Sequence, residues 1–70
     1  MEITYDKEAD ALYISFREGT FFKNKKMDDL TIMDLDRDGN ILGIELLQVS
    51  KRIPPESLSE ISVKNLLALA

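Results

Sequence analysis

The sequence is 70 residues long, carries a formal net charge of −4, and contains neither cysteine nor histidine. This composition excludes disulfide bonds, thiolate zinc sites, a cysteine nucleophile, and the imidazole group that most often moves protons near neutral pH. The 13 acidic residues are spread along the chain, whereas contact with a phosphate backbone relies on clustered lysine and arginine. The sequence therefore predicts a protein with no nucleic-acid partner.

The length and the apolar fraction indicate a single globular domain over residues 1–70. Hydrophobic residues make up 44% of the chain, which is ordinary for a folded domain. No apolar run approaches the ~18 residues that cross a membrane, and no basic-then-apolar signal opens the chain. We therefore expect a cytoplasmic protein without a membrane partner. A core of this size contributes only roughly 3–5 kcal/mol of net stability, so self-association is one expected means of support.

Alternating residues near the start of the chain predict two strands. Ile3 and Tyr5 lie on one face of the first run, and the second run, Ala11 to Phe16, alternates in the same way. Both runs are rich in β-branched and aromatic residues, which favour strands. The acidic connection from Asp6 to Asp10 is typical of a turn, because aspartate side chains bond to nearby backbone amides. We therefore expect a first β-hairpin from Ile3 to Phe16.

The segment from Phe21 to Met27 has two interpretations. It is either an irregular loop or a short edge strand that bears Lys23, Lys25 and Lys26. Lysine on an edge strand discourages pairing with another chain, so the second interpretation has a physical purpose. The residue pattern alone leaves both interpretations open.

The stretch from Leu30 to Val49 predicts the central hairpin of the fold. A two-residue type I′ turn at Asp38-Gly39 and a four-residue loop from Arg37 to Asn40 give the same register. That register pairs Leu35 with Leu42, Met33 with Ile44, and Thr31 with Leu46. A three-residue loop shifts the pairing by one residue and places Asp34 opposite Leu42, which the apolar pattern disfavours.

The second face of this hairpin is not purely polar. It keeps four apolar residues, which are Leu30, Ile32, Ile41 and Leu47. The C-terminal tail or a second copy of the chain is expected to cover part of this face. Gly43 has no side chain and indicates a bulge or the close approach of a neighbouring group.

Two prolines mark the end of the sheet region. Pro54 and Pro55 cannot donate to a strand ladder, and the segment from Pro55 to Ile61 suits a short helical turn. Ser62 is a suitable N-cap for a helix from Val63 to Ala70. Such a helix is too short to persist alone, so we expect it to pack on the sheet.

Five residues match the spacing of a calcium-binding EF-hand loop, namely Asp34, Asp36, Asp38, Gly39 and Glu45. That site requires oxygen ligands that converge from a loop between two helices. Here the flanks read as strands, and two acids on one face of a strand lie ~6–7 Å apart. We therefore predict a turn and a solvated face, with no metal and no cofactor. Calcium binding by Asp34, Asp36, Asp38 and Glu45 is the alternative.

A second acidic spacing, formed by Asp6, Glu8 and Asp10, is typical of turn chemistry and solubility. A carboxylate pair catalyses a reaction only in a pocket that faces a substrate, and the sequence indicates no such pocket. The serines lack a histidine base, and the three glycines form no phosphate-binding loop. We predict no catalytic residue, and a carboxylate-dependent enzyme is the third hypothesis.

Two motifs resemble a known family. The segment from Tyr5 to Ile14, YDKEADALYI, resembles the opening of the small prokaryotic proteins of domain-of-unknown-function family 2283. The segment from Asp34 to Leu46, DLDRDGNILGIEL, is similar to a second motif of that family, and Ser50-Lys51 also fits. The resemblance covers residues 1–52. It implies a stand-alone, mostly antiparallel sheet with little helix and no assigned activity.

These patterns together predict an α+β fold, an antiparallel meander of about four strands with a short C-terminal helix packed on the sheet. The expected core residues are Leu12, Ile14, Phe16, Met33, Leu35, Leu42, Ile44 and Leu46. We predict a non-catalytic binding or interaction module that forms a homo-oligomer or pairs with a small partner protein.

Overall fold

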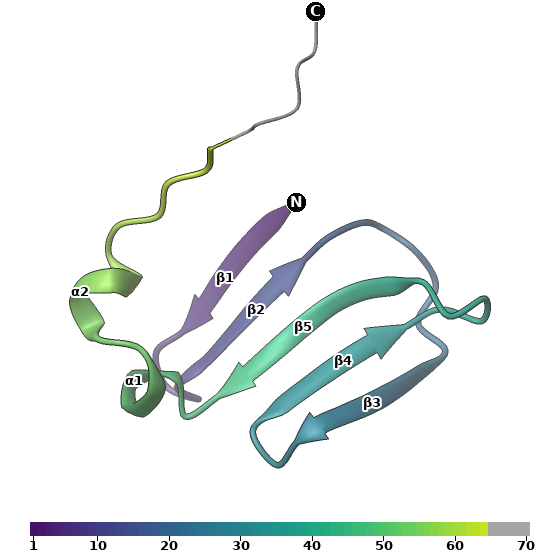
Figure 1. Ribbon diagram of the computed structural model, residues 1–70, viewed down its shortest axis with the longest axis horizontal. Helices are drawn as coiled ribbons and strands as arrows, with labels where there is room; N and C mark the ends of the chain where they lie inside the picture. The colour runs from purple at the N-terminus through teal and green to yellow at the C-terminus, as the bar shows by residue number, and fades with distance from the viewer. Residues whose placement is uncertain (65–70) are drawn as a thin grey trace, which may run out of the picture.

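The computed structural model describes residues 1–64 of the chain. These residues form a five-stranded antiparallel sheet and two short helices, which confirms the α+β class (Figure 1). The strands are β1 (Glu2–Asp6), β2 (Ala11–Ser15), β3 (Lys23–Asp28), β4 (Thr31–Leu35) and β5 (Ile41–Leu47). The helices are α1 (Val49–Arg52) and α2 (Pro55–Leu58).

The strands lie in the order β1-β2-β5-β4-β3, so the sheet is antiparallel as predicted but has five strands instead of about four and is not a single meander. β1 and β2 form one hairpin, β3 to β5 form a meander, and the two units join where β5 pairs with β2 (Figure 1). The apolar strands β2 and β5 take positions with partners on both sides, whereas the exposed, lysine-rich β3 takes an edge. The ambiguous segment from Phe21 to Met27 is therefore an edge strand from Lys23 onward.

The turn between β4 and β5 has three residues, Arg37 to Gly39, and not the predicted two or four. The N–H of Asp36 donates to the carbonyl oxygen of Asn40 at 3.0 Å, and the N–H of Gly39 donates to the carbonyl oxygen of Asp36 at 3.1 Å. Gly39 has a φ of 86°, a conformation that glycine adopts without strain. A three-residue loop with glycine in this position is a common hairpin connection.

A bulge in β5 absorbs the register shift that this loop introduces. Leu35 pairs with Ile41 instead of the predicted Leu42, and the register changes at that point. The pairs beyond the bulge are as predicted, Met33 with Ile44 and Thr31 with Leu46. The apolar pattern decides the outcome, because an uncorrected slip of one residue would turn every side chain of the strand to the opposite face.

Strand pairing gathers the apolar residues on one face of the sheet. Residues that pair directly across antiparallel strands share a face, so each face follows from the register. We call the first the apolar face, and its paired residues are Ile3, Tyr5, Leu12, Ile14, Met33, Leu35, Ile44 and Leu46. Leu42, which the bulge leaves without a direct partner, is two positions from Ile44 along β5 and belongs to the same face. The opposite, polar face includes Thr4, Tyr13, Ile32, Asp34, Gly43 and Glu45.

The predicted core is only partly buried. Of its members, Leu12, Leu35 and Leu42 are buried, and Ile14, Phe16, Met33, Ile44 and Leu46 are half-buried. Val49 in α1, which was not predicted as a core residue, is fully buried. A single sheet needs a second layer to bury its apolar face, and four-residue helices are too small to supply one.

The two helices follow β5 at one corner of the sheet (Figure 1). α2 confirms the predicted short helical turn and begins at Pro55, whereas α1 was not predicted. Of the helix predicted from Val63 to Ala70, residues 63–64 have no regular secondary structure, and residues 65–70 lie outside the described part of the chain. No helix within residues 1–64 is long and apolar enough to cross a membrane.

Candidate functional site

The carboxylate of Asp36 closes the turn between β4 and β5. It accepts hydrogen bonds from the N–H of Asp38 at 2.9 Å, from the N–H of Asn40 at 2.8 Å, and from the side-chain amide of Asn40 at 2.9 Å. The side-chain bond from Asn40 is the largest cause that holds the pKa of Asp36 below its ordinary value. These bonds account for Asp36 as a turn residue, because aspartate favours turns by bonding to backbone amides of the following residues.

Asp34 bonds to a tyrosine two strands away instead of turning toward Asp36. The hydroxyl of Tyr13 on β2 donates a hydrogen bond of 3.0 Å to the Oδ2 atom of Asp34 on β4. Gly43 on β5 lies between them, and a Cβ atom there would overlap the Tyr13 hydroxyl. The absence of a side chain at Gly43 thus leaves room for the Tyr13 hydroxyl to reach Asp34. This is the close approach of a neighbouring group that the sequence predicted at Gly43.

The four candidate calcium ligands do not converge. Asp38 is exposed in the turn, and Glu45 lies on the polar face, where it pairs with Ile32 on one side and Tyr13 on the other. Within residues 1–64, no group of three or more histidine, cysteine, aspartate or glutamate side chains is placed to hold a metal ion. The aspartates instead serve a turn and a cross-strand hydrogen bond, so the EF-hand spacing does not produce the geometry of a calcium loop.

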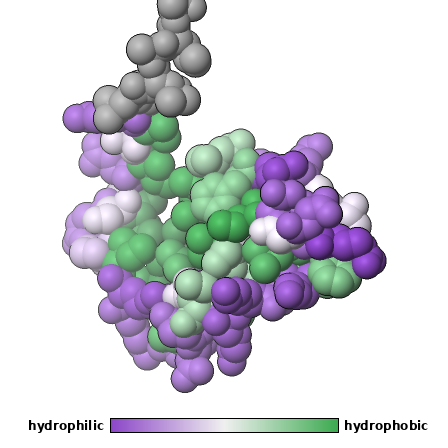
Figure 2. Space-filling model, turned by 45° about the vertical axis from the view of Figure 1, so that its right-hand side comes forward, coloured by the Kyte–Doolittle hydropathy of each residue, from purple (hydrophilic) through white to green (hydrophobic). Residues whose placement is uncertain are grey.

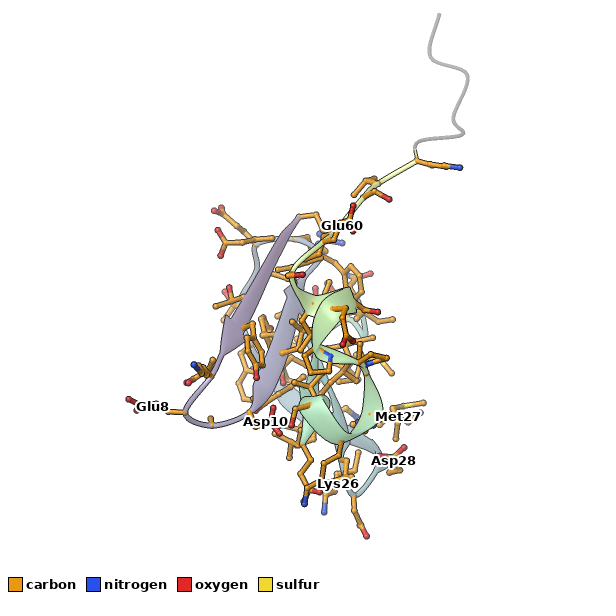
Figure 3. All side chains as sticks on the ribbon, turned by 90° about the vertical axis from the view of Figure 1, so that its left-hand side faces the viewer. Glu8, Asp10, Lys26, Met27, Asp28 and Glu60 are labelled. Atoms are coloured by element: carbon orange, nitrogen blue, oxygen red, sulfur yellow. The ribbon has the colours of Figure 1, made fainter. Side chains whose placement is uncertain are left out.

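The acidic run between β1 and β2 also forms a turn. The Oδ1 atom of Asp6 accepts the N–H groups of Glu8 and Ala9 at 3.0 Å and 3.1 Å. Glu8 points away from the rest of the molecule, whereas Asp10 lies beside α1 (Figure 3). Asp6, Glu8 and Asp10 therefore form no shared site, which agrees with the predicted turn chemistry.

Asp10 ties this turn to the start of α1. Its carboxylate accepts the N–H of Ser50 at 3.0 Å, the hydroxyl of Ser50 at 2.7 Å and the hydroxyl of Tyr5 at 3.2 Å, and its carbonyl oxygen accepts the N–H of Val49 at 3.0 Å. The bond from the Ser50 hydroxyl is the largest cause that lowers the pKa of Asp10. Asp10 adopts a φ of 51°, a left-handed conformation that aspartate tolerates better than most residues. This aspartate therefore supplies the first-turn N–H groups of α1 with acceptors.

Arg52, the last residue of α1, forms hydrogen bonds with the turn between β3 and β4. Its guanidinium group donates to the carbonyl oxygen of Leu30 at 2.8 Å and to the hydroxyl of Thr31 at 2.9 Å. α1 thereby connects the first turn of the chain to the start of β4, and its first residue, Val49, is fully buried.

The sequence did not predict these contacts of α1, because they join positions that are far apart in the chain. Asp10 and Ser50 are 40 residues apart, and Arg52 and Leu30 are 22 residues apart. A four-residue helix gives too short a pattern for its periodicity to be recognised. One available signal was the occurrence of Asp10 and Ser50 in separate segments of the family resemblance.

The centre of the apolar face is only half covered. Ile14, Ile44 and Met33 pair in one row across β2, β5 and β4, and all three are half-buried. Figure 2 shows hydrophobic side chains gathered there, with polar side chains around them. A mainly apolar hollow of about 330 Å³ lies between β1 and α2 and is lined by Tyr5, Lys7, Ser50, Pro55, Leu58 and Ser59. These apolar side chains therefore keep part of their area exposed to solvent.

The two sequence motifs, residues 5–14 and 34–46, contact each other through Tyr13, Asp34 and Gly43. The comparison with known families matches a segment that contains both motifs. A family model described as "Protein of unknown function (DUF2283)" matches residues 2–50. The chain belongs to the DUF2283 family. No curated protein and no solved structure matches it.

The DUF2283 match covers the structural unit that the contacts define. Residues 2–50 include all five strands and end at Ser50, the residue that bonds to Asp10. α2 lies beyond the matched segment. The family resemblance noted in the sequence is therefore confirmed, and the DUF2283 unit of this chain is a sheet closed by the first turn of α1.

Proposed function

We propose that this chain is a non-catalytic protein-interaction module that binds through its apolar face. The observation that carries the proposal is the half-covered row of Ile14, Ile44 and Met33 at the centre of that face. Full burial of an aliphatic side chain contributes ~1.5–3 kcal/mol, so completing the burial of several such residues is a strong driving force for association. The partner is a second copy of the chain or a small partner protein.

The contacts of the acidic residues support a role without catalysis. Asp36, Asp10 and Asp34 each bond to a turn, a helix start or a tyrosine within the fold. Enzymes that use carboxylates place them in a shared pocket that faces the substrate. The hollow of about 330 Å³ beside α2 is lined by no acidic residue. Asp36 and Asp38 line a second hollow of about 270 Å³, but the Asp36 carboxylate there accepts hydrogen bonds from the N–H of Asp38 and the side-chain amide of Asn40. A surface for protein contact fits this arrangement better than a reaction site or a calcium loop does.

The absence of cysteine from the sequence allows a sharp test by site-specific cross-linking. A cysteine at Met33 carries a photoreactive label on the apolar face. A cysteine at Ile32, the half-buried neighbour on the polar face, is the matched control. Labelled protein is irradiated in an extract of the native cells and as the purified chain.

We expect a discrete cross-linked protein product from position 33 and none from position 32. A product of twice the chain mass identifies a second copy, and any other discrete mass identifies a partner protein. Equal products from both positions, or no product from position 33, would rule out the apolar face as a protein-binding surface.

A further inference from the structure

We infer that residues 61–64 of this chain bind the free edge of β1 as a sixth, antiparallel strand, in a second conformation of the segment that follows α2. The site is the outer edge of β1, and its occupant is a segment of the same chain. Binding at this edge does not require the partner protein proposed above. The unpaired backbone of β1, the course of the segment after α2 and the residue patterns of the two segments support it.

The backbone of β1 has unpaired hydrogen-bonding groups at Ile3 and Tyr5. Phe16, just after β2, donates its N–H to a carbonyl oxygen of β5 at 2.9 Å. Backbone groups of successive residues point to opposite sides of a strand, so Tyr13 faces β1, where it pairs with Thr4. The same alternation along β1 turns the N–H and C=O groups of Ile3 and Tyr5 away from β2. Within residues 1–64, β2 is the only strand beside β1, so these groups have no strand partner.

The two edges of the sheet differ in their protection. β3 carries three lysines and an irregularity of register between Lys26 and Asp28, and both features discourage further pairing. β1 pairs with β2 without irregularity and contains neither lysine nor proline. Proteins commonly cover such an edge with another segment of the chain. β1 is therefore the edge that is open to a further strand.

The segment that follows α2 is placed to reach this edge. Figure 1 shows it on the outer side of β1, where it runs in the direction opposite to β1. Ser59 and Lys7 line the same hollow between β1 and α2. An antiparallel register that sets Ser59 opposite Lys7 continues with two more pairs on the same face, which are Ile61 with Tyr5 and Val63 with Ile3. The unpaired backbone groups of β1 thereby gain partners.

The side chains of this register complement those of β1. Ile61 and Val63 are 57% and 82% exposed, and docking places both on the apolar face beside the exposed apolar side chains of β1. On the polar face, Lys64 comes opposite Glu2, which is a pair of opposite charges. A shift of one residue would turn Ile61 and Val63 to the polar face, so the register is specific.

One pair opposes docking and accounts for the second conformation. Glu60 comes opposite Asp6, and like charges in directly opposed positions are destabilising. The added strand therefore begins at Ile61, and the two acids limit the docked population. The structure shows the undocked conformation, in which residues 60–64 have no regular secondary structure.

Disulfide formation tests the register, because the chain has no cysteine of its own. Thr4 and Ser62 are directly opposed in it, at a spacing that a disulfide can bridge. The Thr4→Cys/Ser62→Cys protein is equilibrated with reduced and oxidised glutathione, and Thr4→Cys/Val63→Cys, whose two side chains would lie on opposite faces, is the matched control.

We expect the equilibrium constant for the disulfide within one chain to be roughly tenfold larger for the 4–62 pair than for the 4–63 pair, or about 1.4 kcal/mol. Equal constants would overturn the docked strand. A disulfide that links two chains would overturn the chain's own segment as the occupant.

Hydrogen exchange of the full chain tests the backbone pairing. Val63→Pro removes an N–H that faces Ile3 in the docked strand, whereas Ser62→Pro removes one that faces solvent, where an edge strand tolerates proline. We expect the amides of Ile3 and Tyr5 to exchange faster in Val63→Pro than in the native chain, and at the native rate in Ser62→Pro. Equal rates in all three proteins, or equal acceleration in both variants, would overturn the inference. Neither result would affect the proposed function, which the labels at positions 33 and 32 test.

Discussion

The hydroxyl of Tyr13 donates a hydrogen bond of 3.0 Å to Asp34 across the intervening strand β5. The bond joins β2 of the first hairpin to β4 of the second unit, and it passes over Gly43, whose missing side chain leaves room for the tyrosine ring. A polar contact thus spans three strands on the face opposite the apolar one, and it stabilises the junction at which β2 meets β5.

Replacing Gly43 with alanine is expected to destabilise the fold by about 1–3 kcal/mol, the usual effect of inserting a methyl group into a packed site. The new Cβ would overlap the Tyr13 hydroxyl and lie 2.8 Å from the carbonyl oxygen of Ile14. Urea unfolding measures the change. Adding Tyr13→Ala should lower the combined loss below the sum of the two single losses, because the hydroxyl oxygen and the ring carbon that the new Cβ would overlap are both gone. Strictly additive losses would show that Gly43 does not serve the tyrosine.

Removing the Tyr13 hydroxyl is expected to change the alkaline stability of the protein. Burial is the first cause that raises the pKa of Tyr13, and the hydrogen bond to Asp34 is the second. The stability linked to this raised pKa is fully present below about pH 10 and is lost as the pH rises through the raised value. Tyr13→Phe should therefore flatten the fall in urea midpoint above about pH 10. Tyr5→Phe is the comparison, because the pKa of Tyr5 is also raised. If the urea midpoint of Tyr13→Phe declined at alkaline pH as steeply as that of the native chain, the decline would be assigned to Tyr5 instead of Tyr13.

Asp10 is expected to contribute to stability through its charge. Its pKa is lowered, first by the hydrogen bond from Ser50, so the linked stability is present above the ordinary aspartate value near pH 4 and is lost as the pH falls through the lowered pKa. Asp10→Asn keeps a residue that tolerates the φ of 51° but removes the charge. We expect a lower urea midpoint at neutral pH and a flatter decline toward acid. Glu8→Gln is the matched control on the same turn, and an equal effect from both variants would contradict the role of Asp10.

Calcium is expected to leave the thermal stability of the chain unchanged. A ligand that binds only the folded state must raise the melting temperature once its concentration exceeds the dissociation constant. Asp36 and Asp34 already accept hydrogen bonds within the fold, so binding an ion would disrupt them. Differential scanning calorimetry with and without roughly millimolar calcium, the weak end of the EF-hand range, measures this. A rise that disappears in Asp36→Asn would restore the calcium interpretation.

The sequence pattern was sufficient for β1, β2, β4 and β5, because alternation of apolar residues has the same period as a strand, whereas it left the lysine-rich β3 open. It predicted the pairs Met33–Ile44 and Thr31–Leu46 even though it assigned the wrong turn. The prediction took loop length to determine register, whereas the bulge in β5, where Leu42 has no direct partner, makes the two independent. A local residue pattern does not predict such a bulge. The bulge forms because the favoured three-residue turn and the favoured apolar face require registers that differ by one residue.

The strand order and the contacts of α1 with Asp10 and Leu30 could not be predicted from the sequence, for a reason other than loop length. Pairing of β2 with β5 and bonding of Asp10 to Ser50 join residues that are far apart in the chain, and local patterns carry no information on which distant segments meet. The roles of the candidate site residues also depend on contacts that the local pattern does not show. The spacing of Asp34, Asp36 and Asp38 matched a motif, but their hydrogen-bond partners decided their roles.

The β2–β5 junction also has a consequence for how the chain folds. The β1–β2 hairpin and the β3–β4–β5 meander each contain only pairings between neighbours in sequence, so each can form quickly on its own. Their junction requires a long loop to close, and the entropy of that closure opposes it until the junction contacts form. The junction is therefore the slow step of assembly and the place where a chain cut between β2 and β3 would reassemble from two pieces.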